Sequence, residues 1–195
     1  MKNLRCFLAA AFILAAIPAG AADRDITIFG AVQHEEKLTF QSATQTGTTL
    51  GTYDPGTFST FGLRVGHGRI FGGEHTLAYA PNFIDTKSKA VIYNSNILLQ
   101  APLPKAKPYG TVGLGSIFTF GDGFGDFGSK FAINYGAGIK VLPAGPVGVR
   151  FDVRGYTVPS VRFTGPAVTA PGTSTQKQTL NILEAGIGII FSIGN

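Results

Sequence analysis

Hydrophobic and polar residues alternate in the stretch from Pro146 to Thr157, which reads PVGVRFDVRGYT. Val147, Val149, Phe151 and Val153 take every second position, and a glycine or a charged residue takes each position between them. Successive side chains of a β-strand point to opposite faces, so this stretch predicts a strand with one apolar and one charged face. A soluble sheet would bury the apolar face, whereas a membrane barrel would turn it toward lipid. The rest of the chain has to distinguish these two arrangements.

Seven further segments show the same period of two, at residues 25–40, 57–68, 74–83, 90–100, 108–120, 131–142 and 179–193. The connections at 69–73, 101–107 and 143–145 are shorter than those at 41–56, 121–130 and 158–178, and 84–89 is intermediate. Transmembrane barrels alternate short turns with longer loops between strands of about ten residues. Only closure lets such strands cross lipid without unpaired backbone groups. The pattern therefore predicts an all-β fold, an eight-stranded antiparallel up-and-down transmembrane β-barrel.

The N-terminus has the features of a secretory signal peptide. Lys2 and Arg5 precede an apolar run from Cys6 to Ile17, and small residues follow. This run is shorter than the roughly 18 to 25 residues of a spanning helix, and Ala19-Gly20-Ala21 fits a cleavage site. We expect a signal peptide over residues 1–22, cleaved after Ala21 or Ala22, and a barrel domain over residues 23–195.

Composition agrees with this division. The chain has 195 residues, 27 glycines and 14% charged residues, which is rich in glycine and poor in charge for a soluble domain. Its one cysteine, Cys6, would leave with the signal peptide, so no disulfide or thiol chemistry is expected. Loss of Lys2 and Arg5 would leave 14 basic against 11 acidic residues, too mild an excess to indicate nucleic acid.

Three stretches in the C-terminal half carry a resemblance to a known family. They read KPYGTVGLGSIFTF, FAINYGAGIKVLPAGPVGVRFDVRGY and LNILEAGIGIIFSI. The sequence resembles the eight-stranded outer-membrane β-barrel family, which includes the OmpA-type membrane domain. The resemblance implies a place in the bacterial outer membrane. It also implies contact with outer-membrane lipid and lipopolysaccharide, and insertion by the barrel-assembly machinery. No peptidoglycan-binding domain is expected after the last strand, and we expect a monomer.

Alternation assigns residues to the two faces of this expected barrel. The predicted lumen charges are Arg64, Glu74, Lys140, Arg150, Asp152, Arg154 and Glu184. The predicted lipid-facing residues are Phe61, Leu63, Val65, Leu77, Val112, Leu114, Ile133, Tyr135, Ile139, Val147, Val149, Phe151, Val153, Ile187, Ile189 and Phe191. Eight strands enclose an interior just wide enough for side chains, so charges there must be paired. Such pairs would either close a structural lumen, which we favour, or line a gated conduction path.

Other candidate chemistry has a simpler explanation in each case. The pairs Gly113/Gly115, Gly136/Gly138 and Gly186/Gly188 lack the following helix of a nucleotide-binding turn, and fit the inner face of curved strands. His34, His67 and His75 form no catalytic constellation with a serine and an acid. Asp122 and Asp126 lack the spacing of a calcium loop and are expected in an outer loop. No catalytic, cofactor-binding or metal site is therefore predicted.

Aromatic residues near the segment ends predict interfacial girdles. They are Tyr79, Phe83, Tyr93, Tyr109, Phe118, Phe131 and Tyr135.

The favoured function is a non-enzymatic outer-membrane barrel with a structural or surface-interaction role through its extracellular loops. A narrow porin-like channel for small polar solutes or ions is the alternative. An outer-membrane lipid-modifying enzyme or protease is a weaker third hypothesis, motivated by the histidines and the loop lengths.

Overall fold

The computed structural model describes residues 23–44, 47–123, 126–142, 145–161 and 178–193. The predicted signal peptide at residues 1–22 lies outside these ranges. The described chain forms ten strands. They are β1 (Arg24–Glu35), β2 (Leu38–Thr44), β3 (Gly47–Tyr53), β4 (Thr57–His67), β5 (Phe71–Ala80), β6 (Ser88–Gln100), β7 (Ala106–Gly121), β8 (Ser129–Val141), β9 (Val147–Val161) and β10 (Gln178–Ile193). None of this described chain forms a helix long and apolar enough to cross a membrane.

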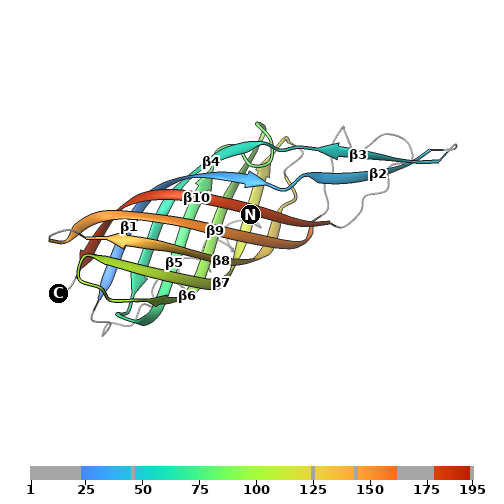
Figure 1. Ribbon diagram of the computed structural model, residues 1–195. Helices are drawn as coiled ribbons and strands as arrows, with labels where there is room; N and C mark the ends of the chain where they lie inside the picture. The colour runs from blue at the N-terminus through green and yellow to red at the C-terminus, as the bar shows by residue number, and fades with distance from the viewer. Residues whose placement is uncertain (1–22, 45–46, 124–125, 143–144, 162–177, 194–195) are drawn as a thin grey trace.

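Eight of these strands close into an antiparallel barrel in the order β1-β10-β9-β8-β7-β6-β5-β4 (Figure 1). The seam between the first and last strands pairs continuously, from Arg24 opposite Ile193 to Glu35 opposite Ile182. On its other side β1 pairs with β4, from Arg24 opposite His67 to His34 opposite Thr57. Every barrel strand thus has a hydrogen-bonded neighbour on both sides, which removes the open edges that lipid would not tolerate. The predicted eight-stranded barrel is confirmed.

The two ends of the barrel differ in their connections. The short connections at residues 68–70, 101–105 and 142–146 share one end with the start of β1 and the finish of β10, and we call this the turn end. Strands β1, β5, β7 and β9 finish at the opposite end, which we call the loop end, and the segments of sequence that follow them are longer. β5 begins at Phe71, so the first turn is shorter than the predicted range of 69–73.

The predicted loop at residues 41–56 contains a β-hairpin instead. β1 ends at Glu35 rather than near Phe40, and β2 and β3 then pair from Leu38 opposite Tyr53 to Thr44 opposite Gly47. This two-stranded sheet projects beyond the loop end (Figure 1). Threonine favours extended backbone, and the ladder gives the N–H and C=O groups of this segment partners within it. The loop prediction was wrong because polar composition alone does not reveal local pairing.

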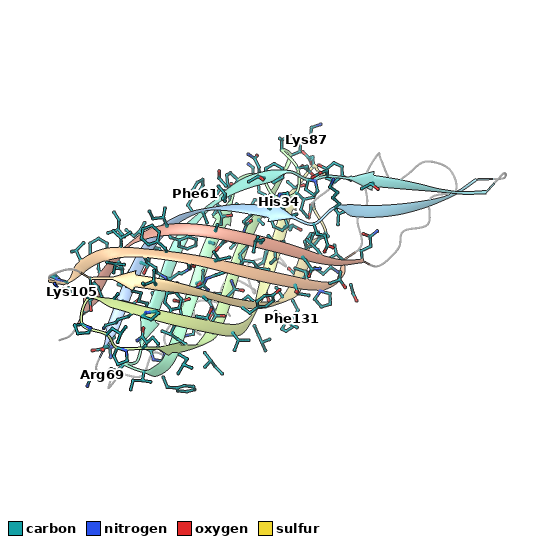
Figure 2. All side chains as sticks on the ribbon, viewed as in Figure 1. His34, Phe61, Arg69, Lys87, Lys105 and Phe131 are labelled. Atoms are coloured by element: carbon teal, nitrogen blue, oxygen red, sulfur yellow. The ribbon has the colours of Figure 1, made fainter. Side chains whose placement is uncertain are left out.

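Alternation separates the two faces of the wall as predicted from the period of two. Apolar residues cover the outside, where Phe61 is 48% and Phe131 is 49% exposed; both stand out from the wall in Figure 2. The structure places all sixteen predicted lipid-facing residues on this outer face. Val65 is the one that is half-buried, and the other fifteen are exposed. Their contact with lipid stays a prediction.

The interior at the loop end is filled by apolar side chains, which we call the apolar plug. It comprises Leu38, Phe83, Ile84, Ala90, Ile92, Ile117, Val158, Val161, Leu180 and Ile182, each at most 3% exposed. Phe83 and Ile84 come from the connection between β5 and β6, and the Phe83 ring meets the Phe127 ring edge-on at 6.0 Å between centroids. Phe83 was predicted in an interfacial girdle. It lies instead in the plug, because its loop folds over the interior.

Candidate functional site

Strand β9 places three charged side chains inside the barrel, since Arg150, Asp152 and Arg154 alternate with outward apolar residues. Arg64 on β4, Glu74 on β5, Lys140 on β8 and Glu184 on β10 also point inward. All seven predicted lumen charges are at most 5% exposed. The structure therefore gathers them from five strands into one interior, and we call the group the lumen network.

Two carboxylates lie at the centre of the lumen network. Asp152 accepts hydrogen bonds from Arg64 Nη1 at 2.6 Å and from Arg154 Nε at 2.9 Å, and Arg150 Nε lies 3.6 Å away. Glu74 Oε2 forms an ion pair with Arg150 Nη1 at 2.6 Å, and Glu74 Oε1 accepts a hydrogen bond from Arg154 Nη2. Each central carboxylate is thus shared by at least two guanidinium groups.

Arg64 extends the network toward β10. Its Nη2 donates to Glu184 Oε1 at 2.8 Å, and its guanidinium lies 3.6 Å from the centroid of the Phe29 ring. Glu184 also accepts from Gln33 Nε2 at 3.0 Å and from the Tyr156 hydroxyl at 3.4 Å. Stacking on Phe29 gives the delocalised cation of Arg64 a further favourable partner.

Lys140 forms a second ion pair closer to the turn end. Its Nζ lies 2.6 Å from Asp25 Oδ2 and 3.2 Å from Gln100 Oε1. The Tyr109 ring connects this pair to the centre, because Lys140 Nζ lies 5.6 Å from its centroid and Arg150 Nε donates to its hydroxyl at 2.8 Å. Tyr109 was predicted in an interfacial girdle. It is an inner-face residue, 6% exposed, so that assignment was wrong.

Glycines make room for the large inner side chains. A Cβ on Gly138 would lie 2.3 Å from the Tyr109 hydroxyl oxygen, and one on Gly136 would lie 2.8 Å from Arg154 Cγ. Both distances are too short for real contacts, so these positions must lack a side chain for their neighbours to occupy the lumen. This spatial need explains the paired glycines of β8 without nucleotide binding.

The charges of the lumen network balance when Asp25, the partner of Lys140, is counted with its seven residues. Four cations, Arg64, Lys140, Arg150 and Arg154, face four carboxylates, those of Asp25, Glu74, Asp152 and Glu184. A buried ion costs several kcal/mol (on the order of 20 in an idealised low-dielectric medium) unless partners compensate it. The network meets this cost by multiple pairing, so the arrangement ties β4, β5, β8, β9 and β10 together and leaves no isolated lumen charge among these eight residues.

Sequence reasoning missed several members of the site. Asp25 and Phe29 lie on the inner face of β1, and Tyr156 lies two residues beyond Arg154 on the inner face of β9. Asp25 lies two residues before Thr27. Extending the alternation by one step would therefore have placed it on the inner face with Thr27 and Gln33. Phe29 and Tyr156 also share the parity of the inner-face residues of their strands, but the alternation does not show that they contact Arg64 and Glu184.

The three histidines lie outside the lumen network. His34 Nδ1 is 3.3 Å from Thr57 Oγ1, and His75 Nδ1 is 3.1 Å from the Tyr93 hydroxyl. Within the described ranges no three histidine, cysteine or acidic residues gather as metal ligands would. Asp126 accepts hydrogen bonds from Thr119 Oγ1 and from the Gly128 N–H, which are contacts that shape a loop.

The family model described as an outer membrane protein beta-barrel domain matches residues 7–188. The chain belongs to this family. It is accordingly a protein of the bacterial outer membrane. Short turns face the periplasm in such barrels, so the loop end is the extracellular end and the hairpin projects from the cell surface.

Three solved structures illustrate the shared fold. OprG from Pseudomonas aeruginosa is 13% identical with a TM-score of 0.59, over 90% of this chain and 97% of that chain. Neisserial surface protein A (NspA) is 10% identical with a TM-score of 0.52, over 85% and 96%. Ail, the attachment invasion locus protein of Yersinia pestis, is 13% identical with a TM-score of 0.51, over 89% and 99%. No curated protein matches the chain. Identities this low establish the fold alone.

Proposed function

We propose that this outer-membrane protein is a non-enzymatic barrel with a closed lumen, serving envelope integrity or surface interaction through its extracellular elements. The proposal rests on one observation. Charged side chains fill one level of the barrel interior, and apolar side chains fill the level next to it. The lumen network occupies the cross-section around Asp152 and Glu74, and the apolar plug fills the extracellular end. Eight strands leave little further space.

The extracellular elements are the parts of the chain that remain available for a function. The hairpin β2–β3 stands clear of the barrel wall (Figure 1). Its base is anchored, because Leu38 is 2% exposed in the plug and the Tyr53 hydroxyl donates to the Ile84 carbonyl at 3.0 Å. An anchored base with a projecting tip supports a role in contacting molecules outside the cell.

A narrow channel is the second candidate, and one observation favours it. The hydroxyls of Thr27, Thr60 and Thr76 are buried inside the barrel and have no hydrogen-bond partner among the described residues. Buried polar groups are nearly always paired with protein or water, so these positions suit water or a polar solute. A hydrated path past the lumen network would use them.

Single-channel recording separates the two candidates. Purified protein, with folding verified by heat-modifiable migration on gels, is reconstituted into planar bilayers. We expect no conductance steps above background for the wild type. Regular conductance steps from the folded wild-type protein would overturn the closed lumen and establish the channel.

A catalytic role is not proposed. Among the described residues, His34 hydrogen-bonds to Thr57 and His75 to Tyr93, and neither partner is a carboxylate. Replacement of His34, His67 and His75 together is the test, and any esterase or protease activity of the wild type that this variant loses would contradict the non-enzymatic proposal.

A further inference from the structure

The connection between β5 and β6 holds a buried residue in an unfavourable backbone conformation. Ile84 has a φ of +69°, and its side chain is 0% exposed within the apolar plug. A β-branched residue rarely adopts a positive φ, because its Cβ then lies too close to the backbone. Such strain persists only where the surrounding structure holds the residue in place. The contacts of this connection therefore show what keeps it over the interior.

Both chain neighbours of Ile84 are held by hydrogen bonds. The Phe83 N–H donates to the Ser88 carbonyl at 2.9 Å. The Asp85 carboxylate accepts hydrogen bonds from the Lys87 N–H at 2.7 Å and from the Ser88 N–H at 2.8 Å. The strained residue thus lies between two positions that the connection and the start of β6 fix.

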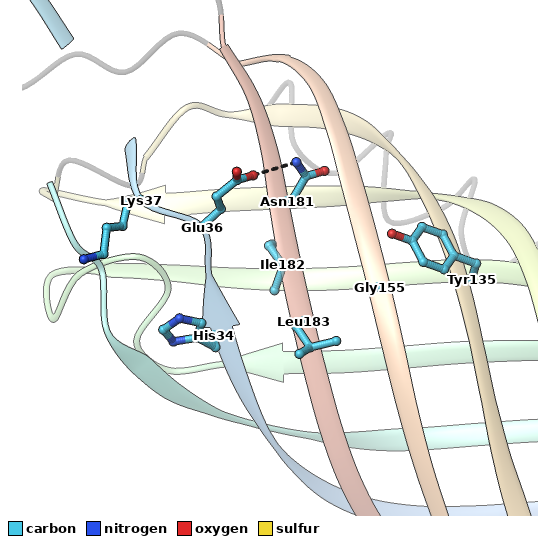
Figure 3. A pocket seen from close by; sticks show the side chains of 8 residues that line it. All are labelled: His34, Glu36, Lys37, Tyr135, Gly155, Asn181, Ile182 and Leu183. Atoms are coloured by element: carbon cyan, nitrogen blue, oxygen red, sulfur yellow. Dashed lines mark hydrogen bonds between the residues drawn. The ribbon is translucent and has the colours of Figure 1, made fainter. Parts of the chain in front are cut away.

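The base of the hairpin β2–β3 is attached to the barrel on two sides. Next to β1, the Glu36 N–H donates to the Asn181 carbonyl at 3.0 Å, and Asn181 Nδ2 donates to Glu36 Oε2 at 2.7 Å (Figure 3). At the end of β3, the Tyr53 hydroxyl donates to the Ile84 carbonyl at 3.0 Å. The first attachment joins the hairpin to the wall, whereas the second joins it to the strained residue of the plug. Movement of the hairpin about Glu36 would therefore separate Tyr53 from Ile84.

A second unfavourable feature lies at the base of the hairpin. Glu35, the last residue of β1, is 0% exposed, and neither of its carboxyl oxygens has a hydrogen-bond partner among the described residues. It lies opposite Ile182, a member of the apolar plug, and within electrostatic range of the Tyr53 hydroxyl. A buried polar group without a partner costs free energy that contact with water would recover. The closed arrangement thus carries two local costs, at Ile84 and at Glu35, and opening would remove both.

We propose that residues 81–87 form a lid over the extracellular half of the lumen, which the hydrogen bond from Tyr53 to Ile84 keeps closed. Displacement of the hairpin breaks this bond, Ile84 relaxes, and the lid moves aside so that water reaches Glu35 and the plug. A partner that moves the hairpin from outside thereby controls access to this half of the lumen. The lumen network stays in place, so the barrel as a whole remains closed to ions. The inference goes beyond the proposed function, because a closed lumen does not require a movable lid.

The test measures how fast a water-soluble maleimide labels a single cysteine of the folded protein in detergent micelles. Cys6→Ser removes the native cysteine, and Ala90→Cys places a thiol in the plug at a position that is 0% exposed. Tyr53→Phe keeps the ring and removes the hydroxyl that holds Ile84. We expect this change to raise the labelling rate about three- to tenfold, as the loss of one hydrogen bond predicts. Tyr79→Phe, at an exposed position of β5, is the matched control and should leave the rate unchanged.

Two substitutions test the strain at Ile84. Ile84→Ala and Ile84→Gly both remove the side chain from the plug, but only glycine adopts a positive φ without strain. In the Tyr53→Phe background we expect the alanine variant to label about fivefold faster than the glycine variant, because strain favours its open state. The same pair in the parent protein keeps the test valid if the combined variants fail to fold.

Heat-modifiable migration verifies the fold of every variant. Thr76→Cys, which replaces Ala90→Cys and places the thiol at the level of the lumen network, should label slowly even with Tyr53→Phe. Equal rates for Tyr53→Phe and Tyr79→Phe would overturn the role of the hydrogen bond, and equal rates for Ile84→Ala and Ile84→Gly would overturn the role of strain. An equal rise at both thiol positions would show loosening of the whole barrel and overturn the lid.

Discussion

Asp152 Oδ2 lies 2.6 Å from Arg64 Nη1, a contact that joins β9 to β4 across the interior of the barrel. The two residues are 88 positions apart in the chain, and β10 and β1 separate their strands in the wall. Their side chains are at most 1% exposed. A short ion pair between non-adjacent strands braces the cross-section of the barrel, in addition to the backbone ladder around its circumference.

Replacement of Asp152 by Asn should destabilise the barrel strongly. The change removes the charge that faces Arg64 and Arg154, and leaves buried guanidinium groups in excess over the remaining carboxylates. Breaking a buried pair on one side typically costs about 3–5 kcal/mol. Urea unfolding in detergent micelles measures the free energy of unfolding. Glu36→Gln at the exposed rim is the control and should stay close to the wild type. Equal stability of the two variants would contradict the bracing role.

Lys140 and Asp25 should be energetically coupled. Their pair lies near the turn end, where the side chain of Asp25 is 13% exposed and that of Lys140 is 1% exposed. Lys140→Met leaves the Asp25 carboxylate without its cation, and Asp25→Asn leaves the buried ammonium without its anion. A double-mutant cycle on unfolding free energies should give a coupling of about 0.5–3 kcal/mol, so that the double variant is more stable than the sum of the single effects predicts. Additive effects of the two substitutions would show that the contact between Lys140 and Asp25 contributes no coupling to the free energy of unfolding.

Gly138→Ala should impair folding, although alanine is usually a conservative change. Its Cβ would lie 2.3 Å from both the Tyr109 hydroxyl oxygen and the Phe151 carbonyl oxygen. Such overpacking costs about 1–3 kcal/mol. Gly30→Ala is the matched control, because a Cβ there would meet nothing within 4 Å. The fraction of folded protein after refolding, read from gel migration, compares the two. A higher folded yield for Gly138→Ala than for Gly30→Ala would exclude the packing explanation.

Trimming the hairpin should leave the barrel intact. Thr39 and Thr52 are a cross-strand pair, so residues 40–51 can be replaced by an Asn-Gly turn that favours a tight hairpin. Leu38 and Tyr53 remain, and with them the base of the hairpin and the hydrogen bond to the Ile84 carbonyl. We expect unchanged heat-modifiable migration together with loss of a surface phenotype of the wild type, such as adhesion or resistance to detergent. Failure of the trimmed chain to fold would show that the hairpin tip is needed for assembly.

The alternation in PVGVRFDVRGYT was enough to assign its two faces, because a strand turns every second side chain to the same side. Low charge, abundant glycine and seven companion segments then indicated a closed barrel with Arg150, Asp152 and Arg154 inside. The same local rule could have included Asp25. It could also have placed Tyr109 inside, because Tyr109 lies two residues before the inner-face residue Thr111.

Tertiary structure decided which charges meet. Arg64 contacts Asp152 and Glu184 rather than an acid beside it, because closure and stagger of the strands bring distant residues to the same level of the interior. The hairpin β2–β3 and the plug that contains Phe83 and Ile84 likewise depend on register and loop placement. Sequence by itself determined the eight barrel strands and their two faces, since these follow from local periodicity. The lumen network and the apolar plug follow from closure of the sheet, which only the three-dimensional structure specifies.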